Sequence, residues 1–139
     1  MAYKHLFIDS DVILDMLFQR DPFYKFAEIL VQDRESNNLS LSTSSLIIAN
    51  VHYLFTKKVG ATRAKEAIKH VINLINVLPF EKEAIEGALS STFNDFEDAI
   101  QSHIANKHNC DFIITRNTKD YKQATLPVLT AEQFLRTLI

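Results

Sequence analysis

Acidic and amide side chains occur in three groups that lie far apart in this 139-residue sequence. In chain order, the groups are Asp9, Asp11 and Asp15; Asp95, Glu97 and Asp98; and Asn117 with Asp120. Carboxylates that meet in one cleft repel each other, and each raises its neighbour's pKa unless a cation neutralises them. Oxygen ligands suit Mg²⁺ or Mn²⁺, which can activate a bound water and stabilise charge on a phosphoryl oxygen. The three groups therefore favour metal-assisted phosphodiester hydrolysis, provided that the fold brings them together.

Each acid also has a structural interpretation. Asp95 and Glu97 lie at the expected start of a helix, where the helix dipole favours acidic residues. Asp15 and Asp120 could each be solvated surface residues. Asp9 is different, because it closes a buried apolar strand, where a charge without a partner is costly. Asp9 is thus the acid that most strongly indicates a site.

The elements that must position these groups alternate between strands and helices. Short apolar runs predict strands and apolar residues at helical spacing predict helices. We expect strands at residues 4–8, 39–41, 76–80, 111–115 and 127–129. We expect helices at residues 12–18, 22–34, 46–57, 62–75, 81–91 and 96–107, and a last one after Thr130. This alternation predicts an α/β sandwich with a mostly parallel central sheet, and we expect residues 1–139 to form a single domain.

Polar residues mark the expected helix starts. Asp21, Thr62 and Asp95 can each cap a helix, and Thr130 with Gln133 has the spacing of a capping box. In an open parallel sheet, ligands bind outside the carboxyl ends of the strands. The polar groups that come after the predicted strands are therefore expected to meet at that edge.

Composition excludes several classes of protein. Cys110 is the single cysteine, which rules out an internal disulfide and a zinc site built from cysteines. The two glycines, Gly60 and Gly87, cannot form a glycine-rich phosphate loop. No run of about 18 apolar residues occurs, so we expect no membrane span, and the cytoplasm is the expected compartment.

The charge balance limits how nucleic acid could bind. Lys and Arg number 15 and Asp and Glu number 17, so the formal net charge is −2. Together with a pI near 6.2, this argues against a broad basic surface for nucleic acid. A local basic rim around an acidic pocket remains compatible with these values.

The segments around the acidic groups resemble the motifs of PIN-domain proteins. Residues 7–15 resemble the family's opening, in which an aspartate ends the first strand and a short helix comes next. Residues 44–50 occupy the place of the second motif, residues 95–101 look like the third, and residues 113–121 look like the fourth. The match covers nearly the whole chain in the family's order.

The resemblance implies a compact three-layer α/β/α domain, often homodimeric, that cleaves single-stranded or structured RNA with Mg²⁺ or Mn²⁺. Many small bacterial members are the toxin of a toxin–antitoxin pair, so an antitoxin protein is an implied partner. On this basis Asp9 and Asp98 would be metal ligands, and Asp120 would complete the catalytic acidic rim. Asp11, where the family often has Asn, would support the loop or the metal's ligands. Thr115 would orient a carboxylate or a water.

Two residues depart from the family pattern. Asn50 stands where the second motif has Glu, and Asn117 stands where the fourth motif has Asp. Each replacement removes a negative charge, although an amide oxygen remains a weaker, neutral ligand. The metal would be held by fewer charges and more waters, with Asp95, Glu97 or Asp120 as compensating acids.

Two other functions fit parts of the sequence. Asp9 and Asp11 also resemble the Asp-x-Asp opening of haloacid-dehalogenase-type phosphatases, with Asp9 as nucleophile and Asp11 as general acid. That interpretation lacks a late pair of adjacent acids and a cap domain. Alternatively, Asn50 and Asn117 could mark a binding module for RNA, a nucleotide or an antitoxin-like helix that has lost catalysis. The metal-dependent ribonuclease is the hypothesis that we favour.

Overall fold

The computed structural model describes residues 3–139, which form a parallel sheet covered by helices on both faces. The strands are β1 (Lys4–Ile8), β2 (Leu39–Ser44), β3 (Asn76–Leu78), β4 (Phe112–Ile114) and β5 (Val128–Leu129). The helices are α1 (Ser10–Phe18), α2 (Phe23–Gln32), α3 (Ser45–Val59), α4 (Ala61–Leu74), α5 (Lys82–Leu89), α6 (Phe96–Lys107) and α7 (Ala131–Arg136), with a 3₁₀ turn η1 (Thr118–Tyr121).

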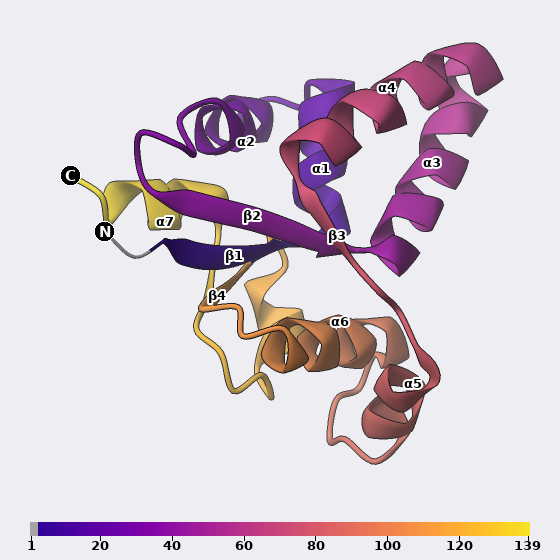
Figure 1. The fold of residues 1–139 in the computed structure, drawn as a ribbon, viewed down its shortest axis with the longest axis vertical. Helices are drawn as coiled ribbons and strands as arrows, with labels where there is room; N and C mark the ends of the chain where they lie inside the picture. The colour runs from indigo at the N-terminus through magenta and orange to yellow at the C-terminus, as the bar shows by residue number, and fades with distance from the viewer. Residues whose placement is uncertain (1–2) are drawn as a thin grey trace.

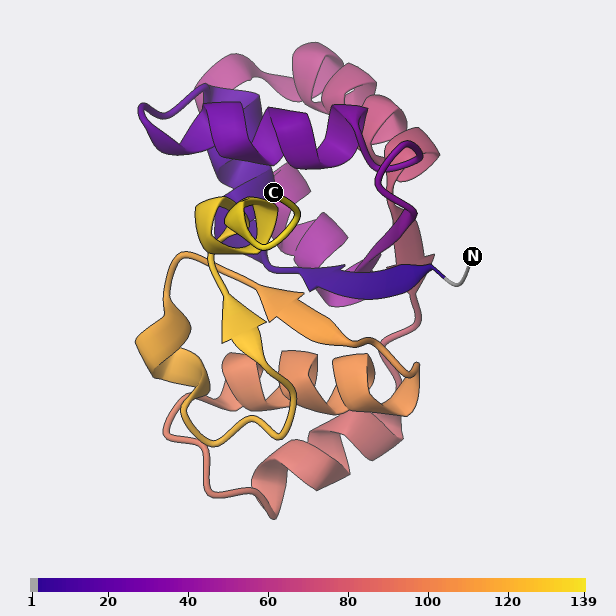
Figure 2. The same cartoon turned by 90° about the vertical axis from the view of Figure 1, so that its left-hand side faces the viewer.

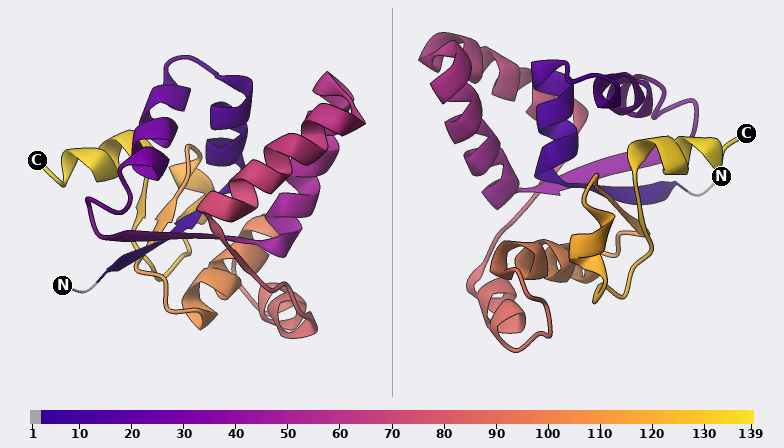
Figure 3. Two further views of the ribbon diagram at one scale, coloured as in Figure 1. Left: turned by 45° about the horizontal axis from the view of Figure 1, so that its top comes forward. Right: turned by 180° about the vertical axis from the view of Figure 1, so that it is seen from behind.

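The sheet has the strand order β3-β2-β1-β4-β5, and every neighbouring pair is parallel. Helices α1 to α4 and α7 cover one face, and α5 and α6 cover the other (Figures 1 and 2). The expected three-layer α/β/α sandwich is therefore confirmed, with a sheet that is parallel throughout the described residues. Figure 3 shows the α3–α4 pair extending away from the sheet.

The core lies on both faces of the central strand. Leu6, Phe7 and Ile8 of β1 are at most 2% exposed, because helices cover both sides of a parallel sheet. Ile113 and Ile114 of β4 are fully buried beside them. This apolar centre fixes the carboxyl ends of β1 and β4 next to each other.

Strand β2 is longer than the sequence predicts. It continues from Leu41 to Ser44 through a Ser-Thr-Ser run that resembles a loop or helix cap. These polar side chains are buried and hydrogen-bonded: Thr43 Oγ1 donates to the carbonyl oxygen of Ile8 over 2.8 Å. Ser44 also caps α3, because its Oγ accepts from the backbone N–H of Ile47 over 3.1 Å. The polar run therefore belongs to the strand and also begins the helix.

Two of the expected helix caps are wrong. Helix α4 begins at Ala61 directly after Gly60, so Thr62 lies inside its first turn. Gly60 ends α3 with a φ of 89°, which glycine tolerates, and the two helices share this one residue. Pro22 precedes α2 and no side chain caps that helix, which leaves Asp21 outside. The caps expected from Asp95 and from Thr130 with Gln133 are confirmed.

The strand order locates the position where a site is expected. After β1 the chain adds β2 on one side of the sheet, whereas β4 lies on the other side of β1. Ligands of open parallel sheets bind where the strand order reverses, outside the carboxyl ends of the strands. In this sheet that position is the edge formed by the ends of β1 and β4. None of the helices within residues 3–139 combines the length and the apolar character that crossing a membrane requires.

Candidate active site

Asp9 directly succeeds β1 and is held at both carboxylate oxygens. Its Oδ1 accepts from the backbone N–H of Ser10 over 2.8 Å, and its Oδ2 accepts from Thr115 Oγ1 over 2.9 Å. The residue is 6% exposed. Burial raises the pKa of Asp9, and the hydrogen bonds from Ser10 and Thr115 oppose that rise. Asp9 is therefore a buried carboxylate with a fixed orientation.

Asp11 connects the first turn of α1 to the loop after β4. Its Oδ2 accepts from Thr115 Oγ1 over 3.2 Å, from the backbone N–H of Arg116 over 3.1 Å and from Asn117 Nδ2 over 3.1 Å. Burial, together with the smaller effect of the Asp9 charge, raises the pKa of Asp11 to about 6. The Thr115 hydroxyl thus lies between two carboxylates, Asp9 and Asp11, and Asn117 contributes its amide as a donor.

Asp98 approaches the same place from the opposite layer. It lies in the first turn of α6, where Asp95 Oδ1 accepts from its backbone N–H over 2.9 Å. Burial, together with the smaller effects of the charges of Asp95, Asp9 and Asp120, raises the pKa of Asp98 to about 7. Asp120 is exposed on η1 and raises the pKa of Asp9 as well. The fold therefore makes the charges of Asp9 and Asp120 raise the pKa of Asp98, although the residues are distant in sequence.

Tyr121 lies within this acidic group, although no motif in the sequence assigns it a role. Its side chain is 2% exposed. Burial, together with the smaller effects of the charges of Asp9 and Asp98, raises the pKa of the Tyr121 hydroxyl. The hydroxyl in turn lowers the pKa of both carboxylates, although neither contact reaches the distance and angle of a hydrogen bond. Its position directly after Asp120 is the only signal that the sequence offers.

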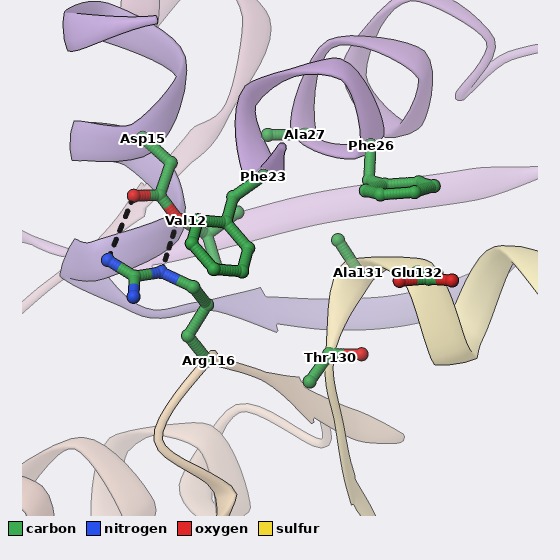
Figure 4. A pocket seen from close by; sticks show the side chains of 9 residues that line it. All are labelled: Val12, Asp15, Phe23, Phe26, Ala27, Arg116, Thr130, Ala131 and Glu132. Carbon is green, nitrogen blue, oxygen red and sulfur yellow. Dashed lines mark hydrogen bonds and ion pairs between the residues drawn. The ribbon is translucent and has the colours of Figure 1, made fainter. Parts of the chain in front are cut away.

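Asp15 is buried rather than solvated, which corrects the surface interpretation. Arg116 reaches it with two bonds, Nε to Oδ2 over 2.6 Å and Nη2 to Oδ1 over 3.0 Å (Figure 4). The Arg116 guanidinium also lies 4.3 Å from the ring centroid of Phe23. A cavity of about 200 Å³ opens beside this pair, between α1, α2 and the start of α7. Arg116 is a second residue whose role sequence reasoning missed.

Asn50 makes no hydrogen bond to the acidic residues within the described part of the chain. It is half-buried on α3. The start of α3 is nevertheless close to α6, because Ser44 Oγ donates to Gln101 Oε1 over 2.7 Å. Hydrogen bonds connect Asp9, Asp11, Thr115 and Asn117 at the ends of β1 and β4. The charges of Asp95, Asp9 and Asp120 act on Asp98. Glu97 is exposed on α6, and none of the hydrogen bonds or ion pairs among the described residues joins it to them.

The donor set fits a hydrated divalent cation. Within residues 3–139, no three Asp, Glu, His or Cys side chains are grouped to hold an ion together. The charge of Asp9 nevertheless raises the pKa of Asp98, and a bound cation would relieve that repulsion. Mg²⁺ is commonly bound through one or two carboxylates while it keeps several waters. Asp9 and Asp98 are the two carboxylates that would hold such an ion.

A comparison with protein-family models decides the family. The model of the PIN domain matches residues 5–119, which include all the site residues except Asp120 and Tyr121. The chain belongs to the PIN-domain family. The hypothesis of a haloacid-dehalogenase-type phosphatase loses its support at this point, because the Asp9–Asp11 opening lies inside the PIN match and Asp11 is engaged by the loop after β4.

This PIN domain is similar to proteins of known name. Ribonuclease VapC1 from Aquifex aeolicus (strain VF5) is 31% identical over 139 residues, which cover 96% of this chain and 95% of that protein. VapBC-1 from nontypeable Haemophilus influenzae has a TM-score of 0.68 at 17% identity and covers 92% of this chain and 98% of its own. A toxin–antitoxin complex from Klebsiella pneumoniae has a TM-score of 0.66 at 22% identity, with coverages of 91% and 97%. The two solved structures have the same fold.

Proposed function

We propose that this PIN domain is a metal-dependent endoribonuclease that acts as the toxin of a toxin–antitoxin pair. The observation that supports the proposal is that the charge of Asp9, directly after β1, raises the pKa of Asp98 at the start of α6, although the two residues are 89 positions apart in sequence. Kinship to a protein named as a ribonuclease, at 31% identity over almost the full length of both chains, supports RNA as the substrate.

The residues around the ends of β1 and β4 would have distinct roles in metal binding and catalysis. A bound Mg²⁺ or Mn²⁺ supplies a more acidic coordinated water and stabilises charge on a phosphoryl oxygen. Asp9 and Asp98 would hold the ion, and the hydrogen bond from Thr115 fixes the orientation of the Asp9 carboxylate. Asp120 adds negative charge at the rim, where it would attract the ion and orient a water. Asp11 ties the loop after β4 in place.

The surroundings of the site support an RNA backbone as the ligand. Lys119 and Lys122 are exposed and stand on either side of Asp120 in the sequence. Lysine side chains at the rim of an acidic site can neutralise phosphates beside the scissile bond, although the whole chain carries a net charge of −2. These two lysines would supply the local basic rim that the composition allows.

The partners belong to the same proposal. The two similar solved structures are named VapBC-1 and a toxin–antitoxin complex, which supports an antitoxin protein as a partner of this chain. We further propose that the protein is a homodimer. We also propose that it acts in the cytoplasm, where its RNA substrate and the antitoxin would be present.

Cleavage of a labelled single-stranded RNA tests this function. Wild-type protein should cleave it with Mg²⁺ or Mn²⁺, and EDTA should abolish cleavage. Asp9→Asn and Asp98→Asn keep the side-chain shape but remove a charge, so both should fold and be inactive. Glu35→Gln, at an exposed acid before β2, is the matched control and should retain full activity. A folded Asp9→Asn/Asp98→Asn protein that cleaves RNA at the wild-type rate would refute the proposal.

A binding module without catalysis is the second candidate, and one observation favours it. Among the described residues, no three Asp, Glu, His or Cys side chains are grouped so that they could hold a metal ion. In addition, Asn50 and Asn117 stand where the family motifs have acidic residues. Such a protein would bind the labelled RNA tightly and leave it intact at millimolar Mn²⁺. The same cleavage assay, combined with a filter-binding measurement, separates the two functions.

A further inference from the structure

The end of the α3–α4 hairpin carries a cluster of exposed positive charges. Helix α3 ends and α4 begins at Gly60, and the two helices extend away from the sheet (Figures 1 and 3). The exposed cations within about 8 Å of Gly60 along the helix axes are Lys57, Lys58, Arg63 and Lys65. We call these four residues the basic tip.

No acidic side chain neutralises the basic tip. The sequence has no Asp or Glu between Glu35 and Glu66, and Glu66 itself pairs with Lys69 over 3.7 Å. None of the ion pairs among the described residues includes a member of the tip. Because the tip carries four positive charges and the whole chain has a net charge of −2, the remaining residues have a net charge of −6. The tip is therefore a local basic surface on an otherwise acidic protein.

Helix α3 connects the acidic edge of the sheet to the tip. Phe7 of β1 pairs with Ser42 of β2, so Asp9 and Ser44, each two residues later, lie at the same edge. Helix α3 begins directly after Ser44 and has 15 residues, so it spans about 22 Å. A stacked nucleic-acid strand advances about 3.4 Å per nucleotide, and this span therefore corresponds to about six nucleotides.

An exposed aromatic residue lies on α3 between the edge and the tip. Tyr53 is 59% exposed, and Lys57 Nζ lies 4.3 Å from the centroid of its ring. Proteins that bind single-stranded nucleic acid combine a positive surface for the phosphates with aromatic rings on which bases stack. The combination favours RNA as the occupant over an acidic protein, because carboxylates do not stack on a ring as bases do.

We propose that the basic tip binds the backbone of the RNA substrate about six nucleotides away from the phosphodiester that is cleaved beside Asp9. This second contact rests on the proposed ribonuclease function, and it adds to that function a minimum length of RNA. Lysine and arginine contact phosphates whatever the base, so the tip contributes affinity and no sequence preference.

Replacement of the three tip lysines tests this contact. Lys57→Gln/Lys58→Gln/Lys65→Gln should bind an RNA of about 24 nucleotides more weakly than the wild type does, measured by fluorescence anisotropy in EDTA. Each phosphate contact to a single strand contributes about 0.7 to the slope of log affinity against log salt concentration, so the slope should become shallower by about 2. Because EDTA removes the metal, this measurement does not depend on cleavage.

A variant with the same loss of charge is the matched control. Lys4→Gln/Lys25→Gln/Lys82→Gln changes exposed lysines of β1, α2 and α5, and should keep the wild-type affinity and salt slope. The melting temperatures of both triple variants in EDTA should equal that of the wild type, since all six positions are exposed.

The length of the RNA provides a second readout that a change in folding would not produce. An RNA of about four nucleotides is too short to reach from Asp9 to the tip. The tip variant should therefore cleave it with the wild-type kcat and KM. For the RNA of about 24 nucleotides, KM should rise while kcat stays unchanged, which is the signature of lost uniform binding.

The outcomes separate this contact from the proposed function. If the wild type cleaves RNA and the tip variant binds the long RNA with the wild-type affinity and salt slope, the contact alone is refuted. Equal weakening in the two triple variants would assign the effect to net charge and would also refute it. A poly-glutamate peptide that binds the wild type as tightly as the long RNA does, but not the tip variant, would make the tip a surface for an acidic protein instead. If the wild type cleaves no RNA but the tip variant alone loses affinity for it, the contact stands and the ribonuclease function fails.

Discussion

Arg116 and Asp15 form a bidentate ion pair between the loop after β4 and helix α1, with Nε to Oδ2 at 2.6 Å. The Asp15 side chain is only 2% exposed, whereas Arg116 keeps about a third of its exposure. Arg116 also donates its backbone N–H to Asp11, so one residue holds two acids of α1. The loop after β4 is in this way fixed next to Asp9.

Removal of Arg116 should be costly for stability. Arg116→Ala leaves Asp15 buried with only Arg20, at 3.5 Å, as a cationic partner. We expect the free energy of unfolding in urea to fall by about 2–3 kcal/mol, at the lower end for a broken buried pair because Arg116 is part-exposed. Arg136→Ala breaks an exposed pair with Glu132 and should cost about 0.5 kcal/mol or less. Equal losses in the two variants would contradict a structural role for Arg116.

The hydrogen bond from Asn117 to Asp11 leads to a second prediction, which concerns stability. Asn117→Asp replaces the donor by a second carboxylate opposite Asp11. In metal-free buffer we expect the free energy of unfolding to fall by about 1–3 kcal/mol, from the lost hydrogen bond and the new repulsion.

The reversed pair is the control for that change. Asp11→Asn combined with Asn117→Asp again places an amide opposite a carboxylate, so part of the lost stability should return. The recovery is incomplete because the same Asp11 oxygen also accepts from Thr115 and from the backbone N–H of Arg116. If the double variant is less stable than Asn117→Asp alone, the two side chains are not coupled as the structure indicates.

The raised carboxylate pKa values predict how stability depends on pH without metal. The pKa of Asp98 is about 7 in the folded protein and that of Asp11 about 6, against an ordinary value of 3.8. Between those values the folded state binds more protons than the unfolded state, so stability falls as pH rises. The contribution of Asp98 is fully present below pH 3.8 and is lost as pH rises through about 7.

Urea midpoints in EDTA at several pH values between 5 and 8 measure this dependence. The wild-type midpoint should decrease over that range, and Asp98→Asn should flatten the part that extends to about pH 7. Glu35→Gln, at an exposed acid before β2, should behave like the wild type at every pH. A midpoint that rises with pH in wild-type protein would show that these carboxyl groups are stabilised as anions, contrary to the raised pKa values of Asp98 and Asp11.

The sheet and its acidic edge could be predicted because the relevant signals are local. Asp9 comes directly after an apolar run, and Asp95 and Asp98 lie where a helix begins. The alternation of strands and helices then requires a parallel sheet, whose carboxyl edge gathers the residues that come after each strand. The charges of Asp9 and Asp120 do act on Asp98, whose pKa they raise.

The remaining features depend on contacts between distant positions, which no local pattern contains. Asp15 was open to a surface interpretation because its partner, Arg116, is 101 positions away. Tyr121 stands next to Asp120 as an ordinary aromatic residue, and only the packing of η1 on α6 directs its hydroxyl at two carboxylates. The extension of β2 to Ser44 could not be predicted, because serine and threonine generally favour helix caps and turns. Here the Thr43 hydroxyl donates to a carbonyl oxygen of the neighbouring strand β1, which allows it to lie in a buried strand.

A crystal structure with Mn²⁺ would show directly whether Asp9 and Asp98 share one ion. Crystals grown or soaked in Mn²⁺ at pH 8 should show one anomalous peak in direct contact with carboxylate oxygens of both residues. The peak should be absent from Asp98→Asn crystals treated in the same way. A manganese ion bound elsewhere on the chain, with Asp9 and Asp98 contacting only water, would contradict a shared metal site at the ends of β1 and β4.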